Sequence, residues 1–211
     1  MSDEILDFEV DNDLAKSFIK KTIKLSKNSI FRFHYTKDYS KAYKNIAAVI
    51  EDTWAVQDVS KDDTFITIKA ERRLKQNFDF PKTDNHFNRQ KDRYQFHTLL
   101  AALAFVPEKK IAIDIGGHIG LYSAALLDSF KRVVAFEPSP INARCFKKNA
   151  PNAKLYEVAL GAVAGKTELH IAADNTGNNS IVESFGEEKV SIKVETLDSF
   201  EFSNISLIKI D

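Results

Sequence analysis

Residues 111–127 read IAIDIGGHIGLYSAALL, and this stretch decides the fold. An apolar, β-branched run reaches Asp114, a turn with three glycines follows, and a helix-like apolar pattern comes after the turn. The sequence therefore predicts a buried strand over KKIAIDIG, a glycine turn, and a helix over residues 119–130. A strand, a glycine turn and a helix in this order are typical of the first ligand-binding turn in an open α/β sheet.

The segments after the glycine turn continue to alternate between strand and helix. RVVAFE, residues 132–137, predicts a second buried strand, and Ser139 with Pro140 suits the N-cap and first residue of the next helix. AKLYEVAL, residues 153–160, predicts a third strand. This spacing indicates βαβ units, and hence an α/β fold with a central, mostly parallel sheet and flanking helices on both faces.

The chain before this alternation has a different pattern, which predicts a small α+β region over residues 1–93. Its expected elements are helices over residues 14–25 and 41–51, a strand at SIFRFHY, and a β-hairpin made of TWAVQDV and TFITIKA. The charged stretch 71–93 has no steady period and is typical of a boundary or loop. A helix pattern starts at Tyr94 and ends before Pro107. We expect an accessory region over residues 1–93 and the main domain over residues 94–211.

Composition narrows the class of protein. The chain has 211 residues, 30 basic and 30 acidic side chains, and 44% hydrophobic residues, so no overall charge favours nucleic acid. One cysteine excludes an internal disulfide, and the five scattered histidines show no metal-ligand spacing. The acidic start MSDEILDFEVDND does not resemble a signal peptide, and no apolar run is long enough to span a membrane. We expect a cytoplasmic protein without a transmembrane segment, and leave homo-oligomerisation open.

The glycine turn and an acidic residue downstream together predict a nucleoside pocket. Gly116, Gly117 and Gly120 permit positive φ and remove a Cβ that would collide with a ligand, next to the N-terminus of a helix. Glu137 lies 23 residues beyond Asp114, at the end of the next strand. An acidic residue at that place accepts hydrogen bonds from ribose hydroxyls.

The spacing of the glycines differs from that of a dinucleotide fingerprint. G-x-G-x-x-G starting at Gly116 needs glycine where His118 and Leu121 stand, and the chain has D-x-G-x-x-x-G instead. S-adenosylmethionine carries an amino acid end, a sulfonium and a ribose but no phosphate, and the acidic strand end at Asp114 suits its ammonium group. A NAD-type oxidoreductase, another nucleotide and a glycine turn without a ligand are the alternatives.

Several motifs, taken in order, resemble those of the FkbM-like family of S-adenosylmethionine-dependent methyltransferases. They are IAIDIGGHIGLYSAAL, VVAFEPSPINARCFKKN, YEVALGAVAGKTELHI, NTGNNS, VETLDSF and ISLIKID. The resemblance covers about residues 94–211. It implies a Rossmann-like methyltransferase fold, S-adenosylmethionine as cofactor, and methylation of hydroxyls on sugars, glycans or secondary metabolites.

The resemblance also implies roles for individual residues. Asp114, Gly116 and Gly120 would line the methionine end of the cofactor, with Gly117 in the same turn, and Glu137 the ribose. Ala159 would lie near the adenine, at the end of the third strand. Asp211 matches the aspartate of the family's K-I-D-V-E-G segment, at the end of the fourth strand and beside the transferring methyl. The pair Gly117-His118 departs from the family, which more often has alanine and asparagine there.

Two weaker candidates concern the acceptor. His118 could act as a base, because imidazole titrates near neutrality, or simply face solvent or bond the loop backbone. The loop DNTGNNS offers Asn175, Gly177, Asn178 and Ser180 to sugar hydroxyls, or forms an ordinary Asx and glycine turn. Cys145 follows the helix pattern and is expected to serve packing.

The expected reaction is an in-line attack of an acceptor hydroxyl on the sulfonium methyl, with Asp211 or His118 as base. The family continues beyond the segment that ends here at Asp211, so we expect a sheet cut after its fourth strand, with an exposed apolar edge. A truncated, non-catalytic module that binds a nucleoside or a partner is therefore a further alternative.

Overall fold

The computed structural model describes residues 4–22, 25, 28–35, 38–50, 54–72, 78–82, 84, 95–172, 174–182 and 188–211, and the statements below concern these residues. Its contacts divide the chain into two compact units. The first comprises Met1–Gln76 and Asp92–Pro107, and the second comprises Asn77–Lys91 and Glu108–Asp211. The helix that begins after Tyr94 makes its contacts in the first unit. The expected domain boundary after residue 93 stays a prediction.

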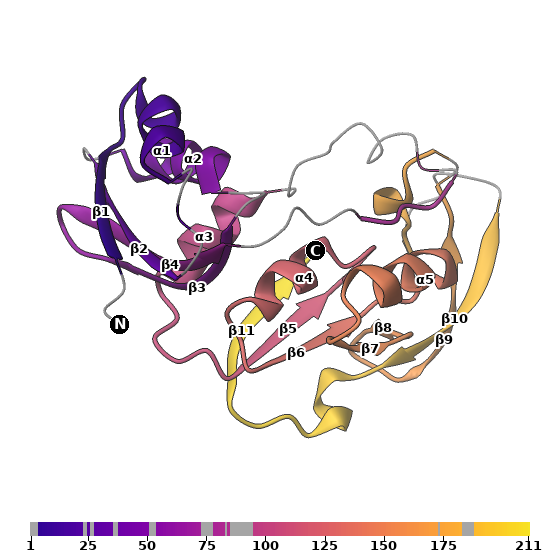
Figure 1. The fold of residues 1–211 in the computed structure, drawn as a ribbon. Coiled ribbons are helices and arrows are strands. Elements are labelled where there is room, and N and C mark those ends of the chain that lie inside the picture. Colours follow the sequence, from indigo (N-terminus) through magenta and orange to yellow (C-terminus); the bar gives the residue numbers. More distant parts are fainter. Residues whose placement is uncertain are drawn as a thin grey trace. The chain divides into compact units, whose positions relative to one another are not determined.

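The first unit contains a four-stranded sheet in the order β1-β2-β4-β3 (Figure 1). Its strands are β1 (Glu4–Glu9), β2 (Ser29–His34), β3 (Trp54–Lys61) and β4 (Phe65–Arg72). β3 and β4 pair antiparallel, which confirms the predicted hairpin. β1 pairs parallel with β2, and it was not predicted because its apolar residues do not alternate regularly with its acidic ones.

Three helices accompany this sheet: α1 (Leu14–Thr22), α2 (Tyr39–Ile50) and α3 (Phe96–Leu103). The core between them is aromatic, with Phe8, Phe18, Phe31, Phe33 and Trp54 all buried. The rings of Phe31 and Trp54 meet edge to face with centroids 4.7 Å apart. Each such ring removes a large apolar area from water, so this unit has a substantial core of its own.

The second unit is built on a four-stranded parallel sheet in the order β11-β5-β6-β7 (Figure 1). The strands are β5 (Ile111–Ile115), β6 (Arg132–Phe136), β7 (Lys154–Tyr156) and β11 (Ile205–Ile210). Helix α4 (Leu121–Leu127) follows β5, and α5 (Pro140–Asn149) follows β6 with Ser139 as its N-cap. This arrangement fits the Rossmann-like fold expected from the sequence.

The two faces of the parallel sheet are covered differently. On one face, α4 and α5 pack through Ala124 and Phe146 against Ala135 of β6. On the other face, Phe136 meets Phe200 of the 3-10 helix η3 (Leu197–Phe200), with ring centroids 4.9 Å apart. We expected flanking helices on both faces. In the described part of the chain, α-helices cover one face, and the 3-10 helix η3 with its aromatic side chains packs on the other.

A second, three-stranded sheet has the order β8-β10-β9. It consists of β8 (Ala159–Leu160), β9 (Gly165–His170) and β10 (Lys189–Glu195). The prediction of one strand over residues 153–160 was wrong, because the chain leaves the parallel sheet after Tyr156 and then pairs with β10. At this break the exposed Glu157 side chain pairs with Lys147 of α5 instead of entering a core.

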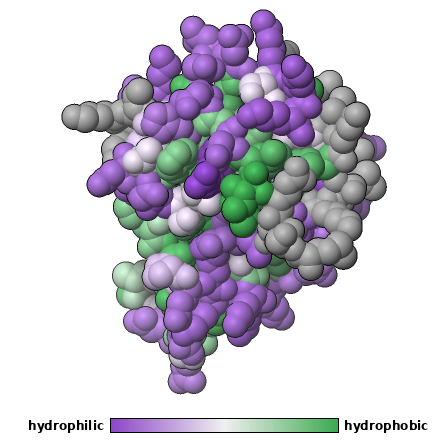
Figure 2. Space-filling view, turned by 60° about the vertical axis from the view of Figure 1, so that its left-hand side comes forward, coloured by the Kyte–Doolittle hydropathy of each residue, from purple (hydrophilic) through white to green (hydrophobic). Residues whose placement is uncertain are grey.

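The surface shown in Figure 2 is mainly hydrophilic, with smaller hydrophobic patches between the polar side chains. On β11, the edge strand of the parallel sheet, Ile205, Ile208 and Ile210 are exposed. None of the described helices combines the length and the apolar character that crossing a membrane would require.

Candidate functional site

The glycine turn follows β5 and adopts left-handed backbone conformations at three positions. Gly116 has φ 75°, His118 has φ 48° and Gly120 has φ 90°. Glycine takes up such angles without steric cost, whereas a histidine needs compensation. His118 obtains it from Glu137, whose Oε2 accepts its backbone N–H at 2.8 Å.

The N–H groups of the turn are engaged within the protein. The Gly116 and Gly117 N–H groups both donate to the carbonyl of Phe136 at 3.0 Å, and the Gly120 N–H donates to Gly117 at 2.8 Å. The His118 N–H is the one held by Glu137. A phosphate-binding turn presents free N–H groups to its anion. These four donors are therefore unsuited to cradle a pyrophosphate.

Packing inside the protein also requires two of these glycines. A Cβ added to Gly117 would lie 3.0 Å from Phe146 Cε2, and one added to Gly120 would lie 3.1 Å from Phe146 Cδ2. Both distances are tighter than ordinary van der Waals contact. The glycines thus allow the turn to pack on α5, and alone they are not evidence of a ligand.

Glu137 connects the glycine turn to the start of α5. The residue is 6% exposed, and the other oxygen of its carboxylate, Oε1, accepts the Ser139 N–H at 2.8 Å. Burial raises the pKa of Glu137 to about 7, while the two N–H bonds act in the opposite direction. A carboxylate has about four acceptor positions, so this one can accept further hydroxyl donors. Beside it, Ser139 Oγ and Asn142 Oδ1 are buried without a partner among the described residues.

Asp114 is completely buried beneath the turn; its Oδ2 accepts a hydrogen bond, whereas its Oδ1 has an ion-pair contact and no hydrogen bond. Ser123 Oγ donates to Oδ2 at 2.7 Å, and Lys209 Nζ lies 3.1 Å from Oδ1. Burial raises the pKa of Asp114, and Lys209 opposes that rise. The Lys209 ammonium also donates to the Gly116 carbonyl at 3.1 Å and contacts Asp211 Oδ2 at 3.3 Å.

A buried hydrogen-bond chain reaches the turn from two distant segments. Thr176 Oγ1 donates to Asp84 Oδ2 at 2.6 Å, and His118 Nε2 lies 2.8 Å from the same threonine oxygen. Because the threonine proton is given to Asp84, His118 Nε2 must be the donor to Thr176. Burial lowers the pKa of His118 to about 4, so the ring is neutral near pH 7 with its proton on Nε2.

Most of the predicted site residues lie at the carboxyl ends of β5, β6 and β11. Contacts around the glycine turn link five of them: Gly116, Gly117, His118, Glu137 and Asp211. The Asp211 N–H, for example, donates to the carbonyl of Ile115. Ala159 is placed differently. It lies in β8 of the three-stranded sheet, where its side chain packs with Leu169 and Ile192.

The polar loop 174–180 has the geometry of an Asx turn. Asn175 Oδ1 accepts the Gly177 N–H at 3.1 Å, and the Asn178 N–H donates to the Asn175 carbonyl at 2.9 Å. Ser180 Oγ accepts the Val182 N–H at 3.1 Å. Several polar groups of the loop therefore stabilise the loop itself, and Thr176 connects it to His118.

Four residues of the site were not predicted from the sequence: Lys209, Ser123, Thr176 and Asp84. A signal for Lys209 was present, because residues two apart on a strand face the same side and Asp211 was already a candidate. Ser123 lies in the helix that follows the glycine turn, nine residues after Asp114, and no sequence rule pairs these two residues. Asp84 and Thr176 are 92 residues apart, so only the folded chain brings them together.

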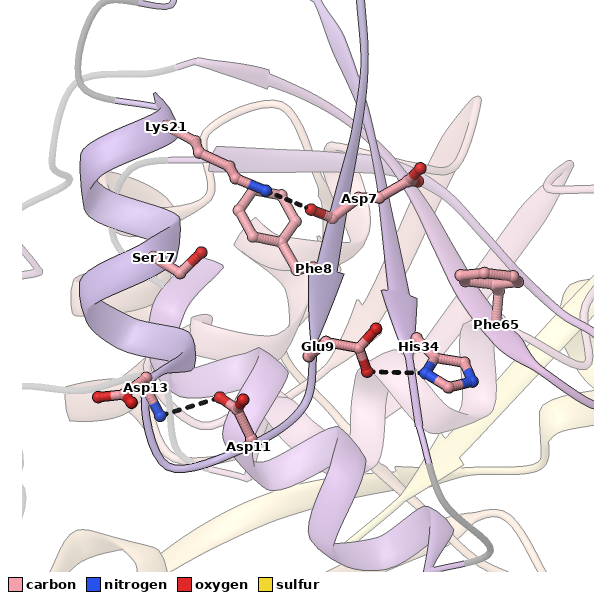
Figure 3. Close-up of a pocket in the computed structure, with 9 residues that line it drawn as sticks. All are labelled: Asp7, Phe8, Glu9, Asp11, Asp13, Ser17, Lys21, His34 and Phe65. Atoms are coloured by element: carbon pink, nitrogen blue, oxygen red, sulfur yellow. Dashed lines mark hydrogen bonds and ion pairs between the residues drawn. The ribbon is translucent and has the colours of Figure 1, made fainter.

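A separate hollow lies in the first unit, against β1 and α1 (Figure 3). Several of its polar side chains are already paired: Glu9 Oε2 lies 2.7 Å from His34 Nδ1, and Lys21 donates to the carbonyl of Asp7. Among the described residues, no group of three acidic, histidine or cysteine side chains is placed to hold a metal ion. We assign no function to this hollow.

The second unit thus has a parallel sheet, a glycine turn and an acidic residue after the second strand, an arrangement that fits a Rossmann-like fold. Residues 114–211 match the family model described as Methyltransferase FkbM domain. This match confirms the resemblance found in the sequence and covers slightly less than half of the chain. Among curated proteins, none matches the chain.

Proposed function

We propose that the chain is an S-adenosylmethionine-dependent methyltransferase that methylates a hydroxyl of a sugar, a glycan or a secondary metabolite. The class rests on the family match, and the acceptor class rests on the resemblance in sequence. One observation supports this choice of cofactor: four N–H groups of the turn donate hydrogen bonds to acceptors within the protein. It disfavours NAD, whose pyrophosphate needs such donors, and suits a nucleoside without phosphate.

The residues present suit this cofactor. Gly116, Gly117 and Gly120 would line its amino acid end, and Glu137 would accept hydrogen bonds from its ribose hydroxyls. The unpartnered buried oxygens of Ser139 and Asn142 add polar groups beside Glu137. When bound, S-adenosylmethionine supplies a methyl group activated by the sulfonium. Ala159 as a neighbour of the adenine remains a prediction.

The protein's own contribution would be alignment and proton removal. Holding the acceptor oxygen in line with the methyl carbon can lower the barrier by up to roughly 7–11 kcal/mol. A base must then take the hydroxyl proton as the new C–O bond forms and the C–S bond breaks. Asp211, with its side chain 69% exposed, is our candidate base. His118 is a weaker candidate, because burial lowers its pKa to about 4. Asn175, Gly177, Asn178 and Ser180 are the proposed acceptor contacts.

The test is calorimetric titration of the purified chain with S-adenosylhomocysteine, with NADH as the control ligand. We expect micromolar binding of the first and none of the second. Glu137→Ala should abolish binding, whereas Glu157→Ala, which removes an exposed carboxylate one strand away, should leave it unchanged. Preferential binding of NADH, or full affinity in Glu137→Ala, would contradict the proposed function.

A further inference from the structure

Lys209 is the cationic side chain at the carboxyl end of β11 that faces the glycine turn. Its ammonium is 3.1 Å from Asp114 Oδ1, 3.1 Å from the carbonyl oxygen of Gly116 and 3.3 Å from Asp211 Oδ2. The side chain is 18% exposed, and the ammonium lies 5.0 Å from the centroid of the Tyr122 ring. The contacts with Gly116 and Asp211 are hydrogen bonds, whereas the contact with Asp114 Oδ1 is an ion pair.

The three contacts of Lys209 are not equivalent. Asp114 is completely buried and the Gly116 carbonyl belongs to the turn, so these two partners are fixed. Asp211 makes the longest contact, and its side chain is 69% exposed. An incoming carboxylate could therefore replace Asp211 while the other two contacts persist.

We propose that Lys209 binds the α-carboxylate of the cofactor's amino acid end, and that Asp114 is a positioning residue that holds Lys209. This inference rests on the proposed function. It changes the role expected for Asp114, which is hydrogen-bonded to Ser123, ion-paired with Lys209 and completely buried. The charges that a ligand can reach at this end of the site are the Lys209 ammonium and the exposed Asp211 carboxylate, and of the two only the cation attracts a carboxylate.

The wild-type chain tests this without any substitution. Affinity for S-adenosylhomocysteine is compared with affinity for its decarboxylated analogue, which keeps the amine, and for methylthioadenosine, which lacks the amino acid end. A charge-assisted hydrogen bond predicts about 10- to 100-fold weaker binding of the decarboxylated analogue. Equal affinity for the two would overturn the role of Lys209. Failure of all three ligands to bind would contradict the proposed function itself.

Variants then locate the carboxylate contact. Lys209→Met should weaken binding of S-adenosylhomocysteine about 10- to 100-fold and leave methylthioadenosine unchanged. Lys110→Met is the matched control, because it removes an exposed lysine at the other end of β5, and it should change neither affinity. Equal losses for both ligands in Lys209→Met would indicate a merely structural lysine.

The single variant leaves Asp114 buried without its cation and can fail to fold. Asp114→Asn/Lys209→Met removes both charges of the pair and is the second variant to measure. It should bind S-adenosylhomocysteine and the decarboxylated analogue with equal affinity. Preserved preference for the carboxylate in this double variant would overturn the proposal.

Discussion

Acidic side chains serve opposite purposes in the two units of this protein. In the first unit Asp7 is exposed and bonded to Arg32, whose hydrogen bond lowers the pKa of that carboxyl. In the second unit Asp114 and Glu137 are buried, and burial raises the pKa of both. Water solvates the first kind of group, whereas the protein alone must compensate the second.

The difference indicates where a functional site is expected. Exposed ion pairs such as Asp7–Arg32 contribute little to stability, and their loss is tolerated because water replaces the partner. Buried carboxylates are retained at a cost in stability, and in a ligand-binding fold they gather where a ligand needs charge. Four predictions test this contrast, beginning with the largest expected effect.

Removing the cation beside Asp114 should have the largest effect. Lys209→Met leaves a completely buried carboxylate without its ion pair, which we expect to lower the free energy of unfolding of the second unit by about 3–5 kcal/mol. Asp114→Asn/Lys209→Met should recover most of this loss. This loss of stability is measured by denaturing the protein and monitoring hydrogen exchange in peptides from β5 and β11. Full stability in the single variant would mean that Asp114 is neutral in the folded protein.

Glu137 should make the second unit less stable as the pH rises. Its pKa is raised from 4.5 to about 7, so the folded protein holds this proton more tightly than the unfolded chain does. The resulting stabilisation is complete below pH 4.5 and is lost as the pH rises through about 7. The shift corresponds to about 3 kcal/mol. Between pH 5 and pH 8 the free energy of unfolding should fall more in the wild type than in Glu137→Gln. The same pH dependence in both proteins would contradict this prediction.

Breaking the buried hydrogen-bond chain should have an intermediate effect. Thr176→Val removes the hydroxyl between His118 and Asp84, and we expect a loss of about 1–3 kcal/mol. Thr176→Ser keeps the hydroxyl and serves as the control. Nitrogen-15 spectra of the imidazole provide a second measure: the wild type should carry its proton on Nε2. A proton on Nδ1 would contradict the chain of donors described above.

The smallest effect is expected in the first unit. Arg32→Met removes the exposed partner of Asp7 and should leave the thermal midpoint within experimental error, because solvent takes over the carboxylate. Asp7→Asn should behave in the same way. If Arg32→Met lost as much stability as Lys209→Met, solvent exposure would not explain the difference between Asp7 and the buried Asp114.

Local patterns predicted much of the second unit. The apolar run before Asp114, the glycine turn and the Ser139-Pro140 helix start lie where the sequence indicated, because each depends on neighbouring residues alone. The break after Tyr156 was missed, because an apolar run does not reveal which partner strand it will meet.

The candidate site was predictable only in its local part. Gly116 and Glu137 follow from spacing along the chain and from the resemblance to a family. The contacts of Lys209 with Asp114 and of Asp84 with Thr176 join residues 95 and 92 positions apart, and they depend on how the strands and loops assemble. These long-range contacts show that two predicted site residues already have partners within the protein: Asp114 pairs with Lys209, and His118 bonds to Thr176.

Trp54 is the only tryptophan of the chain, and it lies in the core of the first unit against Phe31 and near Arg72. Its fluorescence is therefore a built-in optical reporter for the unit that does not contain the proposed cofactor site. A ligand that binds at the glycine turn should leave this emission unchanged if the two units act independently. Any change on titration would measure communication between them, without a label and in the unmodified chain.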